Sequence, residues 1–358
     1  MIEAVDDLLA DRSVIVVVGQ GGVGKTTVAA AIGVRAAQAH GRRVLVVTVD
    51  PARRLADALG VNGLPGEAVL VPVGEGNGRL WVLMVEMSRA WDDLVRQTAP
   101  DPMTAEELLG NGLYRSLTTR FVASHDYVAL DHLCLLEDHG PYDLIVVDTP
   151  PGEHAADMFA APGRLRQFFD SRLLRWLTAG VGGGLTRVAS RPFLRVAERL
   201  LGRDFLGQIG EFFTIFARLR VGLVGRIDRV EAVLASREAA LIEVRAADRV
   251  TSSHPVSRQV DVLLVNRVLP TTRATVSAVG GRRRLELSSP LGPDDFEPIK
   301  DRSLRRAVES LAACTADMIE ELPPGVHVAL LPRQFGGVND LADLVALTDE
   351  AHLEPWHR

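Results

Sequence analysis

Gly19–Thr27 reads GQGGVGKTT, and this stretch decides how the rest of the chain is arranged. It fits the Walker A pattern, in which a glycine-rich backbone wraps a phosphate group with its N–H groups pointing inward. The apolar run Val14–Val18 (VIVVV) precedes it, and an alanine-rich helix is expected at about 26–39. A strand, a glycine loop and a helix in this order predict a phosphate-binding loop at a helix N-terminus.

The loop residues have separate predicted roles. Lys25 supplies positive charge to the β- and γ-phosphates of ATP, and the Thr26 hydroxyl ligates Mg²⁺. Lysine is rare in this chain, which carries most of its positive charge as arginine. A chance glycine-rich turn, the alternative, does not account for the strand, the helix and the lysine together. The predicted nucleotide-binding residues of the loop are Gly19, Gln20, Gly21, Gly22, Val23, Gly24, Lys25, Thr26 and Thr27.

Two aspartates end apolar runs and are the predicted acidic residues of the site. Asp148 closes LIVVD, and as the Walker B carboxylate it is predicted to hold Mg²⁺ directly or through water. Asp50 closes RVLVVTVD, where a carboxylate can orient the water that attacks the γ-phosphate. Doubly wound sheets bind ligands at the carboxyl ends of their strands. Such an aspartate can instead cap a helix or a turn, and this alternative stays open.

Strand and helix signals alternate along the chain, which predicts an α/β fold: a doubly wound, mostly parallel sheet of the P-loop NTPase type. The chain has 358 residues, 47% of them hydrophobic, which suits one large domain at 1–358 with insertions. Strands buried on both faces read as continuous apolar runs. Besides Val14–Val18, the expected strands are 43–49, 80–85, 142–147, 240–244, 262–265 and 326–331.

Two helical insertions, at about 88–138 and 155–235, interrupt this alternation. In the second, apolar residues recur every three or four positions from Phe205 to Leu234, which predicts one amphipathic helix of about eight turns. Its apolar stripe is wider than one partner helix would cover. Two interpretations stay open: a hydrophobic surface for a partner or cargo, and ordinary core packing.

Composition excludes several classes of protein. The formal net charge of −6 gives no electrostatic reason to expect nucleic acid as a partner. Cys134 and Cys314 lie far apart and outside any CxxC pair, so two buried free thiols are expected rather than a disulfide framework or a zinc site. The acidic N-terminus differs from a secretory signal, and no apolar stretch reaches the roughly 18 residues that span a bilayer. We therefore expect a cytoplasmic protein.

Several segments together resemble one known family. The loop GQGGVGKT resembles the deviant Walker A of ATPases related to MinD and ParA, and Val47–Asp57 (VTVDPARRLAD) resembles switch I of the arsenite-pump and Get-pathway targeting ATPases. Val146–His154 (VVDTPPGEH) resembles their switch II. Leu263–Pro270 (LLVNRVLP) resembles the strand whose asparagine contacts adenine, and Asn111–Leu133 resembles bacterial members. The likeness follows most of the chain in order.

The resemblance implies a P-loop domain that dimerises face to face over two ATP molecules, with a helical subdomain that carries cargo. It also implies that Asp50 positions the lytic water, and that Asn266 and Pro332 frame adenine. A membrane-protein cargo or a membrane pump is the partner that such relatives suggest. The expected catalytic positions are Lys25, Asp50 and Gln20.

The chain also departs from the family pattern. Gln20 stands where the family carries a lysine that reaches the partner's phosphates, and glutamine supplies no positive charge. Arg53 or Arg54 of switch I, or a related subunit with its own lysine, would have to supply that cation. Two cysteines form neither a three-thiolate arsenite site nor the CxxC zinc clamp of eukaryotic relatives. The segment 246–262 is shorter and more polar than the helix expected there, so its structure stays open.

Three functions stay open: an ATP-driven chaperone or targeting factor, an ATPase subunit of an anion-extrusion pump, and a slow nucleotide-dependent regulator. The cysteine count argues against arsenite, and Gln20 favours slow turnover. A sulfur-cluster reductase is a weaker alternative, because Cys314 is remote from either switch segment. ATPase rates with and without candidate partners would separate the first three.

Overall fold

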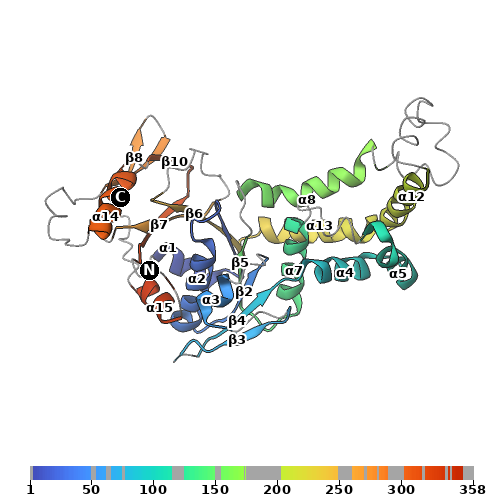
Figure 1. Ribbon diagram of the computed structural model, residues 1–358, viewed down its shortest axis with the longest axis horizontal. Coiled ribbons are helices and arrows are strands. Elements are labelled where there is room, and N and C mark those ends of the chain that lie inside the picture. The colour runs from blue at the N-terminus through green and yellow to red at the C-terminus, as the bar shows by residue number, and fades with distance from the viewer. Residues whose placement is uncertain are drawn as a thin grey trace. The chain divides into compact units, whose positions relative to one another are not determined.

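The chain folds into two compact units (Figure 1). Met1–Met84, Pro141–Ala156 and Ser236–Arg358 form the sheet unit, and Val85–Gly140 and Asp157–Ala235 form the helical unit. The segments of the helical unit lie close to the predicted insertions, and a single independent domain stays a prediction. The computed structural model describes residues 3–49, 54–61, 66–74, 77–114, 125–149, 155–172, 174, 203–248, 260–269, 272–279, 282–288, 302–316, 319–334, 338 and 341–349.

The sheet unit is built on an eight-stranded sheet with the order β11-β7-β6-β1-β5-β2-β4-β3. Neighbouring strands pair in parallel, except that β3 is antiparallel to β4. The central strand β1 lies between β5 and β6, so the strand order reverses there, and doubly wound sheets place their ligands at such a reversal. The strands are β1 (Val14–Val18), β2 (Arg43–Thr48), β3 (Val69–Val71), β4 (Arg79–Met84), β5 (Leu144–Asp148), β6 (Ala239–Ala246), β7 (Val262–Val268) and β11 (His327–Pro332).

The central strands are mostly apolar because both of their faces are buried, and in β1 and β5 the one polar residue is Asp148 at the end of β5. All five residues of β1 and all five of β5 are buried. Alternate residues of the sheet share one core with four helices, and α2 packs on β1, β2, β4 and β5. The predicted α/β fold with a mostly parallel sheet is confirmed. The four helices of this core are α1 (Glu3–Asp11), α2 (Lys25–His40), α3 (Arg54–Leu59) and α15 (Leu341–Asp349).

A second, antiparallel sheet in this unit was not predicted. Its strands are β8 (Arg273–Val279), β9 (Arg282–Ser288) and β10 (Ile319–Leu322), in the order β10-β9-β8, and α14 (Arg302–Ala316) contacts β9. In α14, Cys314 is only partly buried, so the expectation that both thiols are buried holds for Cys134 and is wrong for Cys314. Within the segment whose structure stayed open, residues 249–259 lie outside the described residues.

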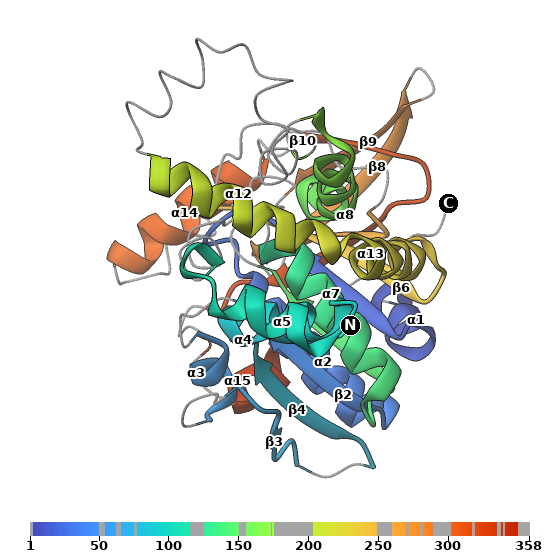
Figure 2. The ribbon, with the colours of Figure 1, turned by 90° about the vertical axis from the view of Figure 1, so that its right-hand side faces the viewer.

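The helical unit corrects the prediction of one eight-turn helix (Figure 2). Two helices, α12 (Arg203–Arg218) and α13 (Arg220–Ala235), meet at a break at Leu219. The Leu219 N–H donates to the carbonyl of Phe216, three residues back, which tightens the chain into a turn. The break lets α12 pack on α5, while α13 packs on α4 and α7. The other helices of the unit are α4 (Met87–Thr98), α5 (Pro102–Gly110), α7 (His125–His139) and α8 (Ala155–Asp170).

Most described side chains of the predicted apolar stripe belong to the core. Phe212 and Phe216 stack with ring centroids 5.7 Å apart, and Phe216 stacks on Phe169 of α8 at 5.3 Å. Val221 is an exception, since 86% of it is exposed. Core packing therefore accounts for most of the stripe. No helix in the described ranges is long and apolar enough to cross a membrane.

Candidate functional site

The predicted phosphate loop, residues 19–24, connects the carboxyl end of β1 to the first turn of α2. Gly24 precedes α2 with a φ of 97°, in the left-handed region that favours glycine. A Cβ atom at this position would lie 2.3 Å from the Asn266 Nδ2 atom, so the close approach also requires glycine. No side chain caps α2 at this end, and its first turn holds no acidic residue. The positive end of this helix therefore suits an anion.

Lys25 lies within the loop that it follows. Its residue surface is only 6% exposed, and Nζ donates to the Gly19 carbonyl at 2.7 Å and to the Gln20 carbonyl at 3.0 Å. Burying an ammonium group is unfavourable unless polar groups surround it. The loop thus holds a positive charge among backbone dipoles, an arrangement that suits a phosphate group.

Asp148 lies at the carboxyl end of β5, next to both β1 and β2. Its register partners are Val17 on β1 and Thr48 on β2. Asp148 is 1% exposed, and the Thr48 hydroxyl donates to its Oδ2 atom at 3.1 Å. A buried carboxylate oriented by a neighbouring hydroxyl fits the role of a Mg²⁺ ligand. Across the described residues, no three His, Cys, Asp or Glu side chains gather into a metal-binding group.

Asn266, the residue predicted to contact adenine, lies against the phosphate loop near the end of β7. Its Nδ2 atom donates to the Val23 carbonyl at 2.8 Å, and its Oδ1 atom accepts from the backbone N–H of Arg267 at 2.8 Å. Pro332 ends β11, the strand beside β7, and is buried. The sequence did not predict the contact with the loop, and the contacts of Asn266 and Pro332 with adenine stay predictions.

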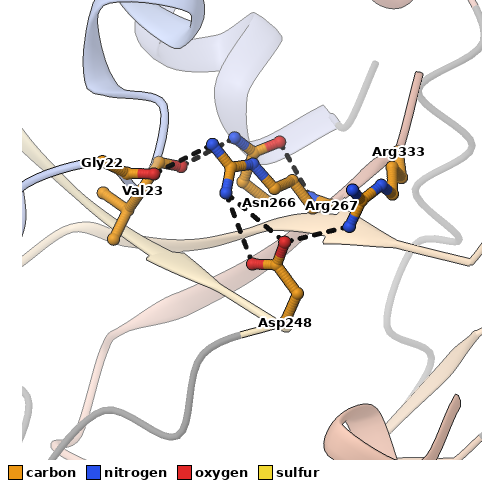
Figure 3. A network of polar contacts seen from close by, with 6 residues as sticks. All are labelled: Gly22, Val23, Asp248, Asn266, Arg267 and Arg333. Atoms are coloured by element: carbon orange, nitrogen blue, oxygen red, sulfur yellow. Dashed lines mark hydrogen bonds and ion pairs between the residues drawn. The ribbon is translucent and has the colours of Figure 1, made fainter. Parts of the chain in front are cut away.

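Three charged residues near the loop were missed: Asp248, Arg267 and Arg333 (Figure 3). Arg267 donates through Nη2 to the Gly22 carbonyl at 2.9 Å, and its Nη1 atom lies 3.4 Å from both carboxylate oxygens of Asp248. Arg333 donates to Asp248 at 2.9 Å. Their positions offered a signal, because each lies within two residues of the end of a strand at the carboxyl edge of the sheet.

Some of the remaining predicted residues are described by the structure, and others lie outside the described residues. Gln20, Thr26 and Thr27 are partly buried, while Gly21 and Gly22 are exposed. Asp50 and Arg53 lie outside the described residues, so the predicted position of the lytic water stays a prediction. Arg54 begins α3. The structure thus places the loop, Lys25, Asp148 and Asn266 near the carboxyl ends of β1, β5 and β7, with β6 between β7 and β1.

Comparison with known proteins agrees with this arrangement. The family of anion-transporting ATPases matches residues 12–289. An uncharacterized protein of Streptomyces coelicolor is 30% identical, over 94% of this chain and 87% of its own length. ATPase GET3C of Arabidopsis thaliana (27% identical) and the arsenical pump-driving ATPase of Escherichia coli (28%) each match over 43% of this chain, and over 41% and 26% of their own lengths. The chain belongs to the anion-transporting ATPase family.

Proposed function

We propose that this chain binds ATP with Mg²⁺ at residues 19–27 and hydrolyses it to ADP and phosphate. The observation that carries the proposal is the buried Lys25 ammonium, held by loop carbonyls beside a helix end that no side chain caps. Loops of this kind cradle the β-phosphate with backbone N–H groups and bring the lysine to the β- and γ-phosphates. Membership of an ATPase family supports the same activity.

Different residues of the chain have separate proposed roles in the reaction. Thr26 and Asp148 would hold Mg²⁺, and the Thr48 hydroxyl keeps the Asp148 carboxylate oriented. When bound, the cation neutralises charge on the phosphates. Asp50 orients the attacking water, and Asn266 and Pro332 frame adenine, as the family resemblance implies. Lys25 stabilises negative charge on the phosphates in the transition state.

Two variants test the proposal. Lys25→Ala is expected to abolish ATP binding, because the loop loses its charge. Asp50→Asn is expected to keep the parent affinity for ATP and to lower turnover at least about 100-fold, because only the transition state uses this contact. Isothermal titration and phosphate release measure the two quantities. ATP binding by Lys25→Ala at the parent affinity would contradict the proposed site, and parent turnover in Asp50→Asn would contradict the role of Asp50 alone.

The active assembly that we propose is a dimer, in which Gln20 leaves a cation to be supplied. A related subunit with its own lysine is the source that we favour, over an identical subunit using Arg53 or Arg54. The isolated chain should then hydrolyse ATP slowly, and such a relative should accelerate it, since cations supplied across an interface are worth roughly 10³–10⁵ in rate. Turnover of the chain alone, of Gln20→Lys and of the two arginine-to-alanine variants tests this. Fast turnover of the chain alone that collapses in an arginine variant would discard the mixed dimer.

Coupling of nucleotide state to a partner or hydrophobic cargo is the proposed output, and the cytoplasm is the proposed location. The second candidate is the ATPase subunit of an anion pump, which the matches to the arsenical pump-driving ATPase and to the family favour. Arsenite and antimonite should not stimulate turnover of this chain, because its two cysteines cannot supply three thiolates without a contribution from a partner. Stimulation that survives replacement of Cys134 and Cys314 by Ser would reveal another mode of metalloid recognition.

A further inference from the structure

Two consecutive residues of β7 hold two consecutive carbonyl groups of the phosphate loop (Figure 3). The amide of Asn266 donates to the Val23 carbonyl at 2.8 Å, and the guanidinium of Arg267 donates to the Gly22 carbonyl at 2.9 Å. We refer to these two side chains as the β7 clamp. Both of its contacts connect residues that are more than 240 positions apart in the sequence. The clamp therefore ties the loop to a strand that is not its neighbour in the chain.

The planarity of the peptide group gives these contacts a consequence for anion binding. In a trans peptide the C=O and N–H bonds point in opposite directions, so fixing a carbonyl also fixes the next N–H group. The Gly22 carbonyl sets the direction of the Val23 N–H, and the Val23 carbonyl sets that of the Gly24 N–H. Carbonyls directed toward β7 turn both N–H groups away from it. Successive N–H groups held in this way make an anion-binding concavity.

The backbone of Arg267 is strained in a way that serves this contact. Its φ is 63°, and it is the one non-glycine residue with a positive φ in the described part of the chain. The pairing of β7 with β11 shifts register here, since Leu331 pairs with Asn266 and Pro332 with Val268, which leaves Arg267 as the bulged residue. Bulges redirect side chains, and strained residues persist where their surroundings determine them. The bulge allows Arg267 and its neighbour Asn266 both to reach the loop.

Asp248 and Arg333 hold the Arg267 guanidinium in place. Asp248 follows β6, and its carboxylate lies between the two arginines, 3.4 Å from Arg267 and 2.9 Å from Arg333. The three side chains together carry one net positive charge beside the loop. A charge of this sign favours a nearby phosphate.

We propose that Arg267 is a positioning residue, which together with Asn266 holds the Val23 and Gly24 N–H groups toward the β-phosphate. The inference rests on the proposed nucleotide binding and explains how the chain keeps its loop in a binding shape. It predicts that loss of the guanidinium loosens the loop whether or not nucleotide is present. Arg267 is not expected to touch the nucleotide itself.

Arg267→Gly separates this role from a structural one. Glycine adopts a φ of 63° without strain, so relief of backbone strain should offset much of the stability lost with the side-chain contacts, and the variant should unfold close to the parent temperature. Hydrogen exchange followed by mass spectrometry should nevertheless show faster exchange of the nucleotide-free segment 19–25. The dissociation constant of ADP should rise at least about tenfold, as expected for the loss of a charge-assisted hydrogen bond. Arg267→Lys should recover part of the affinity, because an ammonium group can still donate to the Gly22 carbonyl.

Two further variants complete the experiment. Asp248→Asn should also speed the exchange of segment 19–25, by a smaller factor, because the Arg267 guanidinium loses a partner, which keeps the test available if Arg267→Gly fails to fold. Exchange and not ADP affinity is the readout for this variant, because removing the carboxylate also adds positive charge beside the loop. Arg273→Ala, which removes an exposed arginine of β8, should change neither quantity. Parent-like exchange and affinity in Arg267→Gly would overturn the clamp. If the parent chain failed to bind ADP, the proposed function would be wrong, and exchange in segment 19–25 alone would decide the clamp.

Discussion

Asp131 in the helical unit is buried in a different way from Lys25 and Asp148 in the sheet unit. In the helical unit, Asp131 of α7 accepts two hydrogen bonds from Arg226 of α13, at 2.5 and 2.9 Å, and is 3% exposed. In the sheet unit, Lys25 donates to backbone carbonyls and Asp148 accepts from a hydroxyl, both where strands end. The bidentate pair matches its own charges and fixes two helices. The strand-end charges lie where a parallel sheet presents ligand-binding groups.

The partner of a buried charge indicates whether packing or a ligand explains its burial. A charge that meets its counterpart in good geometry is explained by packing, since an unpaired buried charge is costly. A charge oriented by backbone dipoles and a hydroxyl at the carboxyl edge of the sheet is explained better by a ligand. Matched substitutions in the two units can test this comparison.

The largest expected effect on stability is that of Arg226→Ala. The change leaves the Asp131 carboxylate buried without its guanidinium and should lower the free energy of unfolding by about 3–5 kcal/mol. Urea denaturation followed by tryptophan fluorescence measures it. Arg218→Ala is the matched control, because Arg218 forms an exposed ion pair with Glu107 at 3.2 Å and should cost less than about 1 kcal/mol. ADP affinity of the folded protein should not change. An equal loss of unfolding free energy in the two variants would show that burial of Asp131 does not make its ion pair more important than an exposed one.

The same variant has a predictable dependence on pH. Burial raises the pKa of Asp131 above its ordinary value in spite of the Arg226 guanidinium beside it. Without Arg226 this pKa should rise further, so the neutral acid becomes the favoured form in the folded chain. A raised folded pKa means that stability falls as pH rises from the unfolded pKa to the folded one. Arg226→Ala should therefore lower the free energy of unfolding less at pH 5 than at pH 7.5. An equal loss at the two pH values would contradict a raised pKa of Asp131 in the variant.

Gly24 in the sheet unit and Gly222 in the helical unit both lack room for a Cβ atom. At Gly24 the added atom would lie 2.3 Å from Asn266 Nδ2, and at Gly222 it would lie 2.4 Å from the Thr98 carbonyl oxygen. Gly24→Ala should weaken ADP binding at least about tenfold, because it displaces the β7 clamp. Gly222→Ala should lower the free energy of unfolding by about 1–3 kcal/mol without changing ADP affinity.

Gly225→Ala in the same helix is the control for Gly222→Ala. Apart from the backbone of its own helix and its chain neighbours, no atom lies within 4 Å of its added Cβ, so alanine should stabilise the helix by about 0.5–1 kcal/mol. Melting temperature and ADP titration of all three variants measure the effects. A loss of ADP affinity in Gly222→Ala would contradict the expectation that Gly222 affects stability alone.

The central sheet could be predicted because its strands are apolar runs buried on both faces. Strands that are not continuous apolar runs were missed. β8 and β9 alternate small, apolar and charged residues, as RATVSAV and RRRLELS, and β3 has three residues at the sheet edge. The break at Leu219 was also missed, because apolar spacing continues through it when both helices need a buried face.

In the site, sequence motifs predicted the residues that come directly after β1 and at the end of β5. The β7 clamp was not predictable from spacing, since it depends on a bulge and on a positive φ at an arginine. Both features arise from tertiary pairing, which local propensity does not encode. Asn266 was found through family resemblance, but its contact with Val23 was not.

The smallest expected effect on stability is that of Thr98→Val, and Thr48→Val is its counterpart in the sheet unit. Thr48 donates to Asp148 at 3.1 Å in the sheet unit, and Thr98 donates to the Leu94 carbonyl at 2.6 Å within α4. Valine keeps the shape of threonine and removes the donor in both. Thr98→Val should change the free energy of unfolding by less than about 0.5 kcal/mol, because a bond from a side chain to the carbonyl four residues back adds little to a helix. Thr48→Val should cost about 1.5 kcal/mol, because a buried carboxylate loses a donor. Thr48→Val should also raise the Mg²⁺ concentration needed for half-maximal turnover, because Asp148 loses the group that orients it, whereas Thr98→Val should not. Identical Mg²⁺ dependence in parent and Thr48→Val would show that the Thr48 hydroxyl does not orient Asp148 for cation binding.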